Sequence, residues 1–413
     1  MQNMIDVPLN LPAVTVVNTE IKEDGTTFIS VKSTEDGTCC SKCGQHITKS
    51  YGYAPERQVR HTSVFGSEVY ICFTPKRFEC TDCEGSPTTV QRLAWIKPGS
   101  SYTIPFEEHI LIQLVNSTVE DVCIKENINY DAVEGILDRH IDTKVNWDEI
   151  KSLPILGVDE FSVKKGHKNF FTIISTQINN KPVVLTILKD RKKDTVKKFF
   201  SSIPKRLRKT IRIVCCDMYD GYINAAKEIF GKKARVTADR FHVAKIYRGC
   251  LDTLRKSELR RLKKELKPDE YKKLSGVMWI LRKSPHDLKP EEKEKLSLLF
   301  KYSSDLELAY MLCNDLTDIF NKNISMTGAR RKILAWKKKV GKSGLSCFDK
   351  FMVTLGNYER EILNYFTGRN TSGFVEGLNN KVKVLKRRCY GLLNLNRWFQ
   401  RLHLDLAGYE LFG

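Results

Sequence analysis

Long apolar runs are missing from this sequence. No stretch of its 413 residues approaches the roughly 18 apolar residues that a membrane-spanning helix needs. The first residues, MQNMIDVPLNLPAV, also lack the basic-then-apolar layout of a secretory signal. Internal repeats and low-complexity tracts are absent too. We therefore expect a cytoplasmic protein.

Acidic residues are scarce relative to basic ones. The chain has 49 acids against 69 lysines and arginines, a net charge of +20. Such a surplus favours a polyanionic partner, either nucleic acid or an anionic membrane, because neutralised phosphates release condensed counterions. Hydrophobic residues make up 41% and aromatic residues 10% of the chain, as in ordinary folded proteins, which excludes disorder as the main state. The length allows two or three domains.

Regularly spaced cysteines are few, although the chain has thirteen cysteines in all. A disulfide framework is not expected in a reducing compartment. The two regular pairs, Cys40-x-x-Cys43 and Cys80-x-x-Cys83, are spaced like the knuckles of a zinc ribbon. Four thiolates would fill the tetrahedral positions around one Zn²⁺, so the ion would be structural.

The alternatives to this zinc site concern the identity of its ligands. The pairing of four cysteines among thirteen could arise by chance. Cys39 competes with Cys40 as a ligand, and His46 lies near enough in sequence to substitute. Cys72, between two apolar residues, is expected in the core.

The period of the apolar residues divides the chain into parts. We expect a β-rich module first, then a helical pair, a mixed sheet built from short apolar runs with helices between them, a charged helical region, and a basic helical end. The predicted fold class is a multidomain α/β protein. The predicted boundaries are 1–100, 101–150, 151–241, 242–368 and 369–413.

The helical pair has the punctuation of a helix-turn-helix. Capping residues at Thr118 and Asn129 open two helices, of which the second runs to His140 and would enter a major groove. An ordinary helical hairpin is the alternative, since this second helix carries three acids. If the pair binds DNA, Lys125, Arg139 and neighbouring modules must supply the positive charge.

Three acids occupy the ends of predicted elements. Asp159 closes the run 155–159 and Asp217 closes the run 211–217, so neighbouring strands would bring them together. Glu376 precedes a helix with the basic residues Lys381, Lys383, Lys386, Arg387 and Arg388. Taken singly, each acid is interpreted as a solvated strand end or a helix cap. Jointly, they are suited to hold Mg²⁺ for chemistry on phosphates.

Other polar residues have weaker assignments. Asp239 and His242 follow the last predicted strand, where His242 could simply begin a helix. Tyr390-Gly391 and Trp398 are expected in packing. Two basic runs, Arg191 to Arg212 and Arg330 to Lys342, are either solvated faces or a track for the phosphate backbone.

Together these motifs resemble the ISL-three family of bacterial insertion-sequence transposases, over nearly the whole chain. The motifs that carry the resemblance are Gly157-Val158-Asp159-Glu160-Phe161-Ser162 with Lys165-Gly166-His167, Asp217-Met218-Tyr219 with Tyr222, Asp239-Arg240-Phe241-His242-Val243, and Glu376-Gly377-Leu378-Asn379-Asn380-Lys381 with Lys386-Arg387-Arg388 and Tyr390-Gly391.

The resemblance implies a ribonuclease-H-like core interrupted by an all-helical insertion, with Asp159, Asp217 and Glu376 as the acidic triad. Two Mg²⁺ ions, or Mn²⁺, would sit about 3.5 to 4 Å apart, with Asp159 bridging them. Water would free a 3′-hydroxyl at the element end, and this hydroxyl would attack target DNA. Asp239 and His242 would help to hold DNA, together with Lys381, Lys386, Arg387 and Arg388.

The resemblance also implies the partners of the protein. The zinc ribbon and helix-turn-helix would recognise terminal inverted repeats, and the protein would act on DNA as a homodimer or higher oligomer, associated with the nucleoid when bound. Two other functions stay open at this point. One is a non-catalytic DNA-binding regulator, and the other is a ribonuclease-H-like nuclease or resolvase that cuts but never joins strands.

Overall fold

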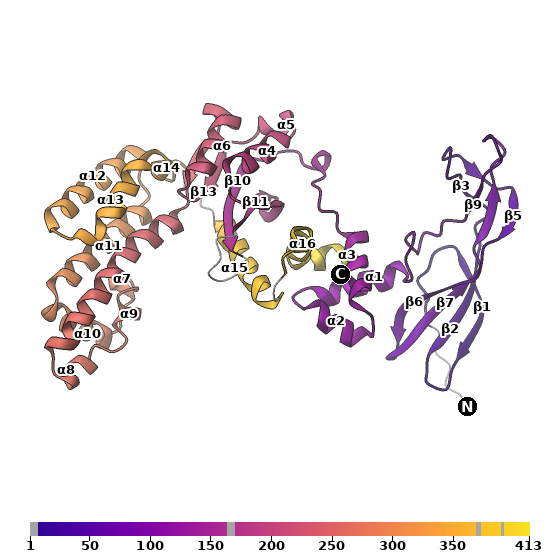
Figure 1. The fold of residues 1–413 in the computed structure, drawn as a ribbon, viewed down its shortest axis with the longest axis horizontal. Helices are drawn as coiled ribbons and strands as arrows, with labels where there is room; N and C mark the ends of the chain where they lie inside the picture. The colour runs from indigo at the N-terminus through magenta and orange to yellow at the C-terminus, as the bar shows by residue number, and fades with distance from the viewer. Residues whose placement is uncertain (1–6, 163–169, 369–372, 390–391) are drawn as a thin grey trace. The chain divides into compact units, whose positions relative to one another are not determined.

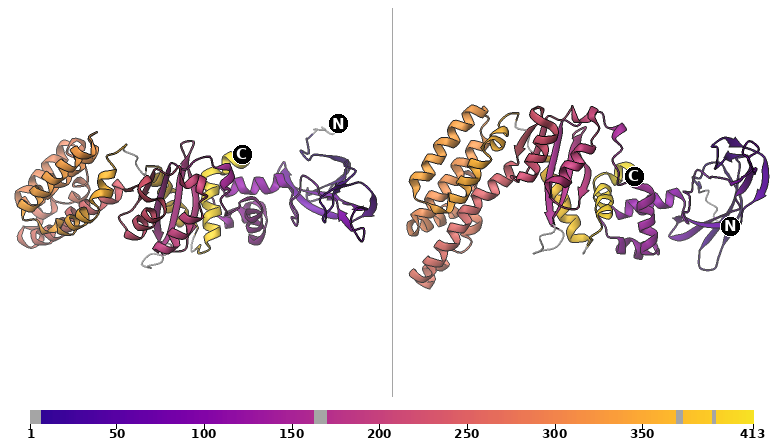
Figure 2. Two further views of the ribbon diagram at one scale, coloured as in Figure 1. Left: turned by 90° about the horizontal axis from the view of Figure 1, so that it is seen from above. Right: turned by 45° about the horizontal axis from the view of Figure 1, so that its top comes forward.

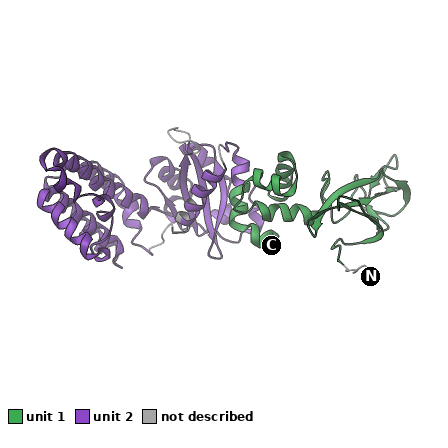
Figure 3. Ribbon diagram, turned by 90° about the horizontal axis from the view of Figure 1, so that it is seen from below, with its two compact units in different colours: residues 1–142, 400–413 green, residues 143–399 purple. Residues whose placement is uncertain are grey.

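The computed structural model describes residues 7–162, 170–368, 373–389 and 392–413, and within these ranges the side chains of residues 373–376 and 379 are not described. The chain divides into two compact units, residues 1–142 with 400–413, and residues 143–399 (Figure 3). Each unit is treated by itself. In the described part of the chain, no helix combines the length and apolar character needed to cross a membrane. The structure confirms the mixed α/β class.

The N-terminal unit begins with a four-stranded sheet in the order β1-β2-β7-β6, in which β2 and β7 run parallel. The period of two is clear in β7, where Val69, Ile71 and Phe73 are buried and the residues between them are not. These three side chains build a small core with Trp95. The strands are β1 Val14–Ile21, β2 Thr27–Ser33, β6 Arg57–Val64 and β7 Ser67–Phe73.

Two smaller sheets carry the cysteine pairs. One pairs β3 (Thr38–Cys39) with β4 (His46–Ile47), and the other has the order β5-β8-β9. Its strands are β5 Ser50–Tyr53, β8 Lys76–Glu79 and β9 Thr88–Val90. The predicted β-rich module is therefore present.

Three short helices follow in the same unit, and their boundaries are set by polar caps. Thr118 and Asp121 form a reciprocal capping box at the start of α2. Asn127, in the left-handed region at φ 51°, ends α2, and Asn129 accepts a hydrogen bond from the amide of Ala132 at the start of α3. A turn at residues 127–129 thus separates the two predicted helices. The helices are α1 Ile104–Leu114, α2 Val119–Glu126 and α3 Tyr130–His140.

The last residues of the chain pack onto these three helices. Helix α16 spans Leu395–Phe412, and Leu404 belongs to the same buried cluster as Leu111 and Ile136. The buried Arg401 donates to the carbonyl oxygens of Leu114 and Ser117. Nothing in the sequence indicated that residues 400–413 belong with the first unit.

The second unit is built on a five-stranded sheet in the order β12-β11-β10-β13-β14. Its first three strands are antiparallel neighbours, whereas β10, β13 and β14 run parallel. Every residue of β13, Ile-Val-Cys-Cys, is buried, as expected of a central parallel strand. The short apolar runs predicted for the mixed sheet form its strands, which are β10 Ile155–Ser162, β11 Phe170–Ile178, β12 Lys181–Leu188, β13 Ile213–Cys216 and β14 Arg235–Ala238.

Helices pack against this sheet. Helices α4 and α6 lie side by side (Figure 1) and bury Val196, Phe200 and Ile223 against Leu156 and Val158 of β10. Helix α15 contacts β10 and β12. The bounds are α4 Lys193–Ser202, α5 Lys205–Arg208, α6 Asp220–Phe230 and α15 Gly373–Arg388, with 3₁₀ turns η1 Trp147–Glu149 and η2 Gly231–Lys233.

Residues 240–364 are helical, without a strand in this fully described range, and form the bundle coloured salmon to orange in Figure 2. Asp239 caps its first helix by accepting from the amide of Phe241 at 2.8 Å. A separate apolar core holds Trp336, Phe348 and Phe351. The helices are α7 Arg240–Glu265, α8 Pro268–Lys272, α9 Val277–Ile280, α10 Pro290–Tyr302, α11 Ser304–Asn321, α12 Met326–Ser343, α13 Asp349–Asn357 and α14 Glu359–Asn364, with 3₁₀ turns η3 Pro285–Asp287 and η4 Ser346–Phe348.

Candidate functional site

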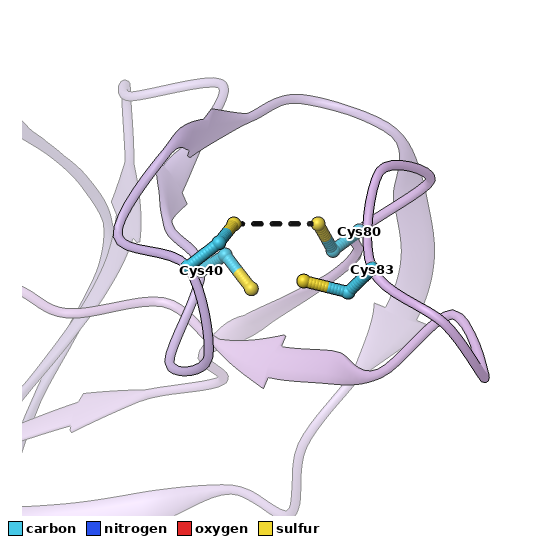
Figure 4. A group of neighbouring side chains, drawn as sticks. Cys40, Cys80 and Cys83 are labelled. Atoms are coloured by element: carbon cyan, nitrogen blue, oxygen red, sulfur yellow. Dashed lines mark hydrogen bonds between the residues drawn. The ribbon is translucent and has the colours of Figure 1, made fainter.

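The four predicted cysteines of the N-terminal unit converge. The sulfur atoms of Cys40, Cys43, Cys80 and Cys83 all lie within 4.8 Å of one another. Figure 4 shows Cys40, Cys80 and Cys83 pointing their thiols toward a common centre. Tetrahedral Zn–S bonds of about 2.3 Å put pairs of sulfurs about 3.8 Å apart. The Sγ atoms of Cys43 and Cys80 are separated by 3.8 Å, so the cluster is compatible with zinc.

Backbone amides favour a thiolate in this cluster. Hydrogen bonds from the backbone of Cys43 and Lys42 lower the pKa of Cys40 to about 6. The neighbouring thiol of Cys43 and then burial raise the pKa of Cys83 to about 12. Four sulfurs this close cannot all carry charge without a cation among them, because like charges disfavour one another's ionisation. A divalent metal would remove that conflict.

The structure decides between the alternative ligands. Cys39 is exposed on β3, where it pairs with His46 on β4, and neither belongs to the sulfur cluster. Alternation along the strand turns Cys39 to the opposite side from the buried Cys40. Cys40 is therefore the member of the cluster.

In the second unit, three aspartates occupy equivalent positions on neighbouring parallel strands. Val158 of β10 pairs with Cys216 of β13, which pairs with Ala238 of β14. The next residues are Asp159, Asp217 and Asp239, which the continued register aligns in one row, named here the aspartate row. Asp217 and Asp239 directly follow β13 and β14, whereas Asp159 does not close its strand as predicted, because β10 continues to Ser162. The sequence predicted that Asp159 and Asp217 would meet. It did not predict Asp239 as a third member, although Asp239 also directly follows a predicted strand.

The members of the aspartate row differ in exposure. The side chain of Asp217 is 31% exposed, whereas Asp159 and Asp239 are buried, each 7% exposed. Asp159 accepts from the amide of Glu160, and Asp217 from the amide of Met218, both at 2.6 Å. Since Leu156 and Val158 face α4 and α6, alternation turns Asp159 to the other face of the sheet.

His242, in the first turn of α7, lies against this row. Its Nδ1 atom is 3.8 Å from Oδ1 of Asp217 and 3.6 Å from Oδ2 of Asp239, beyond hydrogen-bond length. This nitrogen is buried and has no hydrogen-bond partner among the described residues. His242 thus places an imidazole beside two acids of the aspartate row.

The third predicted acid lies on helix α15. This helix contacts β10, the strand that carries Asp159. The side chain of Glu376 is not among those that the structure describes, and the predicted motif residues 165–167 and 390–391 lie outside the described residues. Among described residues, only the four cysteines converge closely enough to form a metal cluster. In the last turns of α15, Arg387 is exposed and Lys386 and Arg388 are half-buried.

Glu107 is a buried acid of the N-terminal unit that the sequence did not reveal. Its carboxylate, 0% exposed, accepts from Ser100 at 2.6 Å and from Arg139 and His140 at 2.7 Å. Burial raises the pKa of Glu107, but the hydrogen bonds of His140, Ser100 and Arg139 outweigh it and lower the pKa. Arg139, expected as a source of positive charge for DNA, thus has its guanidinium engaged with Glu107.

Two of the remaining motif residues serve packing. Trp398 is 1% exposed and donates from its indole nitrogen to the carbonyl of Leu392, as the expectation of packing required. Tyr222 is equally buried and shares a 2.9 Å hydrogen bond with the hydroxyl of Thr172 on β11.

Both basic runs pair part of their charge with neighbouring acids. In the first, Lys193 and Lys197 both pair with Glu228 of α6. In the second, on α12, Arg330 pairs with Glu359 and Lys339 with Asp315. The exposed residues Arg331, Lys332, Lys338 and Lys342 and the half-buried Lys337 form no ion pair with a described carboxylate.

Comparisons with known proteins give consistent matches. A family model described as transposase, of the DDE ISL3 type, matches residues 156–402. The transposase for insertion sequence element IS1001 of Bordetella parapertussis is 25% identical over 384 residues, covering 93% of this chain and 92% of the relative. The transposase for insertion sequence element IS1557 of Mycobacterium tuberculosis is 23% identical over 394 residues, covering 90% and 86%.

Among solved structures, the Drosophila P element transposase strand transfer complex aligns with a TM-score of 0.37 at 11% identity. The alignment covers 74% of this chain and 92% of that one.

Proposed function

Because this chain belongs to the ISL-three (ISL3) family of DDE transposases, we propose that it cuts and joins DNA at the ends of its own insertion sequence with Asp159, Asp217 and Glu376 as the catalytic acids. The observation that supports the proposal is the strand register: Val158 of β10 pairs with Cys216 of β13, and Asp159 and Asp217 are the next residues of these neighbouring parallel segments. The same sheet, with antiparallel β11 and β12 and parallel β13 and β14, supports a ribonuclease-H-like core with residues 242–368 as its helical insertion.

The donor set fits divalent metal ions, which the family uses. Carboxylate oxygens are the ligands that Mg²⁺ and Mn²⁺ prefer, and Asp159 and Asp217 offer them from a rigid sheet. Mg²⁺ bound by the triad would supply Lewis-acid activation of the attacking and leaving oxygens at phosphorus. Glu376 would complete the set from α15, which packs on β10.

The chain's own residues would hold the DNA at this site. We propose that His242, beside Asp217 and Asp239, contacts the DNA strand near the cleavage point. Lys381, Lys386, Arg387 and Arg388 on α15 would bind phosphates next to the acids, because α15 carries Glu376 as well. A water would attack first and release a 3′-hydroxyl, which would then attack the target strand.

End recognition would belong to the N-terminal unit. We propose that the cysteine cluster holds one structural zinc and that α2 and α3 act as the helix-turn-helix. Helix α3 is acidic and its Arg139 is engaged by Glu107. In this helix pair, Lys125 in the last turn of α2 would therefore contact DNA phosphates. The protein would act on inverted repeats and target DNA as a dimer or larger assembly.

A strand-transfer reaction tests this function. The purified protein is incubated with labelled DNA carrying the element's own ends, a target plasmid and Mg²⁺. We expect ends joined covalently to the plasmid. Cleaved ends without joining would indicate a nuclease or resolvase instead, and end binding without any cleavage would indicate a regulator.

A further inference from the structure

A cavity within the helical region has features of a separate binding site. Helices α7 and α11 and the segment around α9 enclose a volume of about 330 Å³. This volume is within the range of pockets that hold small molecules, about 300 to 1,000 Å³. All its lining residues lie between positions 245 and 314, so none belongs to the aspartate row or to α15.

The rim of this cavity is basic. Lys245, Arg248 and Arg282 line it and form no ion pair with a described carboxylate, and Arg255 lines it as well. The one acid in the lining, Asp252, is already neutralised, since its carboxylate lies 2.7 Å from Arg255 and 3.0 Å from Lys256. The cavity therefore carries a net positive charge that its own acid does not cancel.

Arg248 is held in place by the surrounding helices. Its Nη1 atom donates to the carbonyl of Arg282 at 2.7 Å, and its Nη2 atom lies 3.5 Å from the hydroxyl of Thr317. These bonds fix the orientation of the guanidinium without neutralising its charge. A guanidinium fixed in this way is suited to phosphate, which accepts paired hydrogen bonds from it.

The floor of the cavity is apolar. Leu251, Leu281 and Cys313 are buried there, and Met278 is half-buried beside them. Gly249 belongs to the wall, and a Cβ atom added to it would meet nothing within 4 Å. A ligand can therefore approach the backbone of α7 closely and place a flat apolar surface on this floor.

An aromatic residue adjoins the rim. The guanidinium of Arg282 lies over the indole of Trp279, 5.1 Å from the ring centroid, and Trp279 is 63% exposed. This cation–π contact holds the guanidinium of Arg282 at the rim, where it can bind a phosphate. A bare phosphate would use only the basic rim of the cavity, whereas a nucleotide would use both the rim and the apolar floor.

We propose that the cavity lined by Lys245, Arg248 and Arg282 is a nucleotide-binding site, with the phosphates at the basic rim and the base on the apolar floor. This site is separate from the aspartate row and does not depend on the function proposed for it.

Isothermal titration calorimetry of the full-length protein with ATP, GTP and inorganic pyrophosphate tests the proposal. We expect ATP or GTP to bind, and pyrophosphate to bind at least tenfold more weakly. Gly249→Leu would fill the cavity and Arg282→Ala would remove a phosphate ligand, so each should weaken nucleotide binding at least tenfold.

Matched controls separate the cavity from general effects. Gly341→Leu changes another helical glycine with open space around it, on α12, and Lys264→Ala removes an exposed charge from α7. Both should bind nucleotide as the unaltered protein does. Leucine favours helix over glycine, so both glycine variants should stay folded.

Four results would overturn the proposal. The first two are that neither ATP nor GTP binds, and that Gly249→Leu binds nucleotide as tightly as the unaltered protein. The other two are that pyrophosphate binds as tightly as the nucleotides, and that a random 20-base-pair duplex displaces the nucleotide. The last result would assign the cavity to the path of DNA.

Discussion

The cysteine cluster takes its four ligands from two short loops, whereas the aspartate row takes each acid from a different strand. In the cluster, two residues separate the members of each pair, so local chain geometry brings their sulfurs together. In the row, the register of β10, β13 and β14 aligns Asp159, Asp217 and Asp239, which lie far apart in the sequence. The first site depends on two turns and the second on a whole sheet.

This difference has a consequence for function. A site built from loops can be destroyed by altering two residues, and the damage should stay within its own unit. A site built on a sheet keeps its geometry when a single acid is replaced, because the strands are held by their own core. The two sites belong to different compact units, so we expect that destroying one site leaves the other intact.

The largest effect is expected from the acids. Asp159→Asn, Asp217→Asn and Glu376→Gln each remove a metal-binding charge at nearly constant shape, and loss of several kcal/mol of transition-state stabilisation slows cleavage by about a thousandfold or more. End binding in a gel shift should persist. Asp194→Asn on the exposed side of α4 is the control, and an acid variant that cuts at the control's rate does not belong to the site.

The next effect is expected from the cysteines. Cys80→Ser with Cys83→Ser should remove one zinc per chain and unfold the N-terminal β-rich part, because the binding energy of such a site is largely folding energy. Selection of inverted repeats over random DNA should be lost, and the second unit should keep its structure. Zinc content and competition binding measure both effects.

Cys39→Ser is the matched control for this pair, since Cys39 is the exposed neighbour of Cys40. It should keep full zinc and full selectivity. Loss of zinc in Cys39→Ser, or selectivity retained after loss of zinc, would contradict the assigned ligands or their role.

A smaller effect is expected from Glu107, which joins α1 to α3 without a metal. Glu107→Gln leaves Arg139 without its buried counter-charge and should lower the free energy of unfolding of the N-terminal unit by about 3 kcal/mol. The lowered pKa of Glu107 means that its stabilisation is present above the ordinary value of 4.5 and is lost as the pH falls through the lowered value.

Unfolding of the N-terminal unit, followed by circular dichroism between pH 7 and pH 3, checks both statements about Glu107. Glu108→Gln, on the same helix, is the control and should leave stability and its pH dependence unchanged. Equal stability of the two variants would show that the network around Glu107 contributes nothing.

The smallest effect is expected from the basic residues of α15. Replacing Lys386, Arg387 and Arg388 with alanine should weaken binding to specific and random DNA alike, because phosphate contacts carry no direct sequence information. The slope of log affinity against log salt should fall by about 2 to 3, the value for three lost contacts. Replacing Arg260, Lys263 and Lys264 of α7 removes the same charge and should leave the slope unchanged.

The sequence predicted features that depend on local chemistry better than those that depend on contacts between distant residues. The strands of the five-stranded sheet, the caps at Thr118 and Asn129 and all four clustered cysteines follow from short patterns of residues, and the structure confirms them. The choice of Cys40 over Cys39 required the orientation of β3, which the cysteine spacing alone does not give.

Long-range contacts account for what the sequence did not reveal. Glu107 and Arg139 lie on different helices, and no motif marks a buried acid as the partner of an arginine. The packing of residues 400–413 on the N-terminal helices depends on Arg401 and Leu404, which read simply as parts of one more amphipathic helix. The roles of Asp159, Asp217 and Glu376 stay predictions.

Localised cleavage of the protein itself tests most directly whether these three acids form one metal site. Fe²⁺ replaces Mg²⁺ in the zinc-loaded protein, and ascorbate with hydrogen peroxide then generates hydroxyl radicals that cut the backbone beside the bound iron. We predict cuts next to Asp159, Asp217 and Glu376 together, and the loss of all three in Asp217→Asn. Cuts at only one of these positions, or an unchanged pattern in Asp217→Asn, would contradict a shared site.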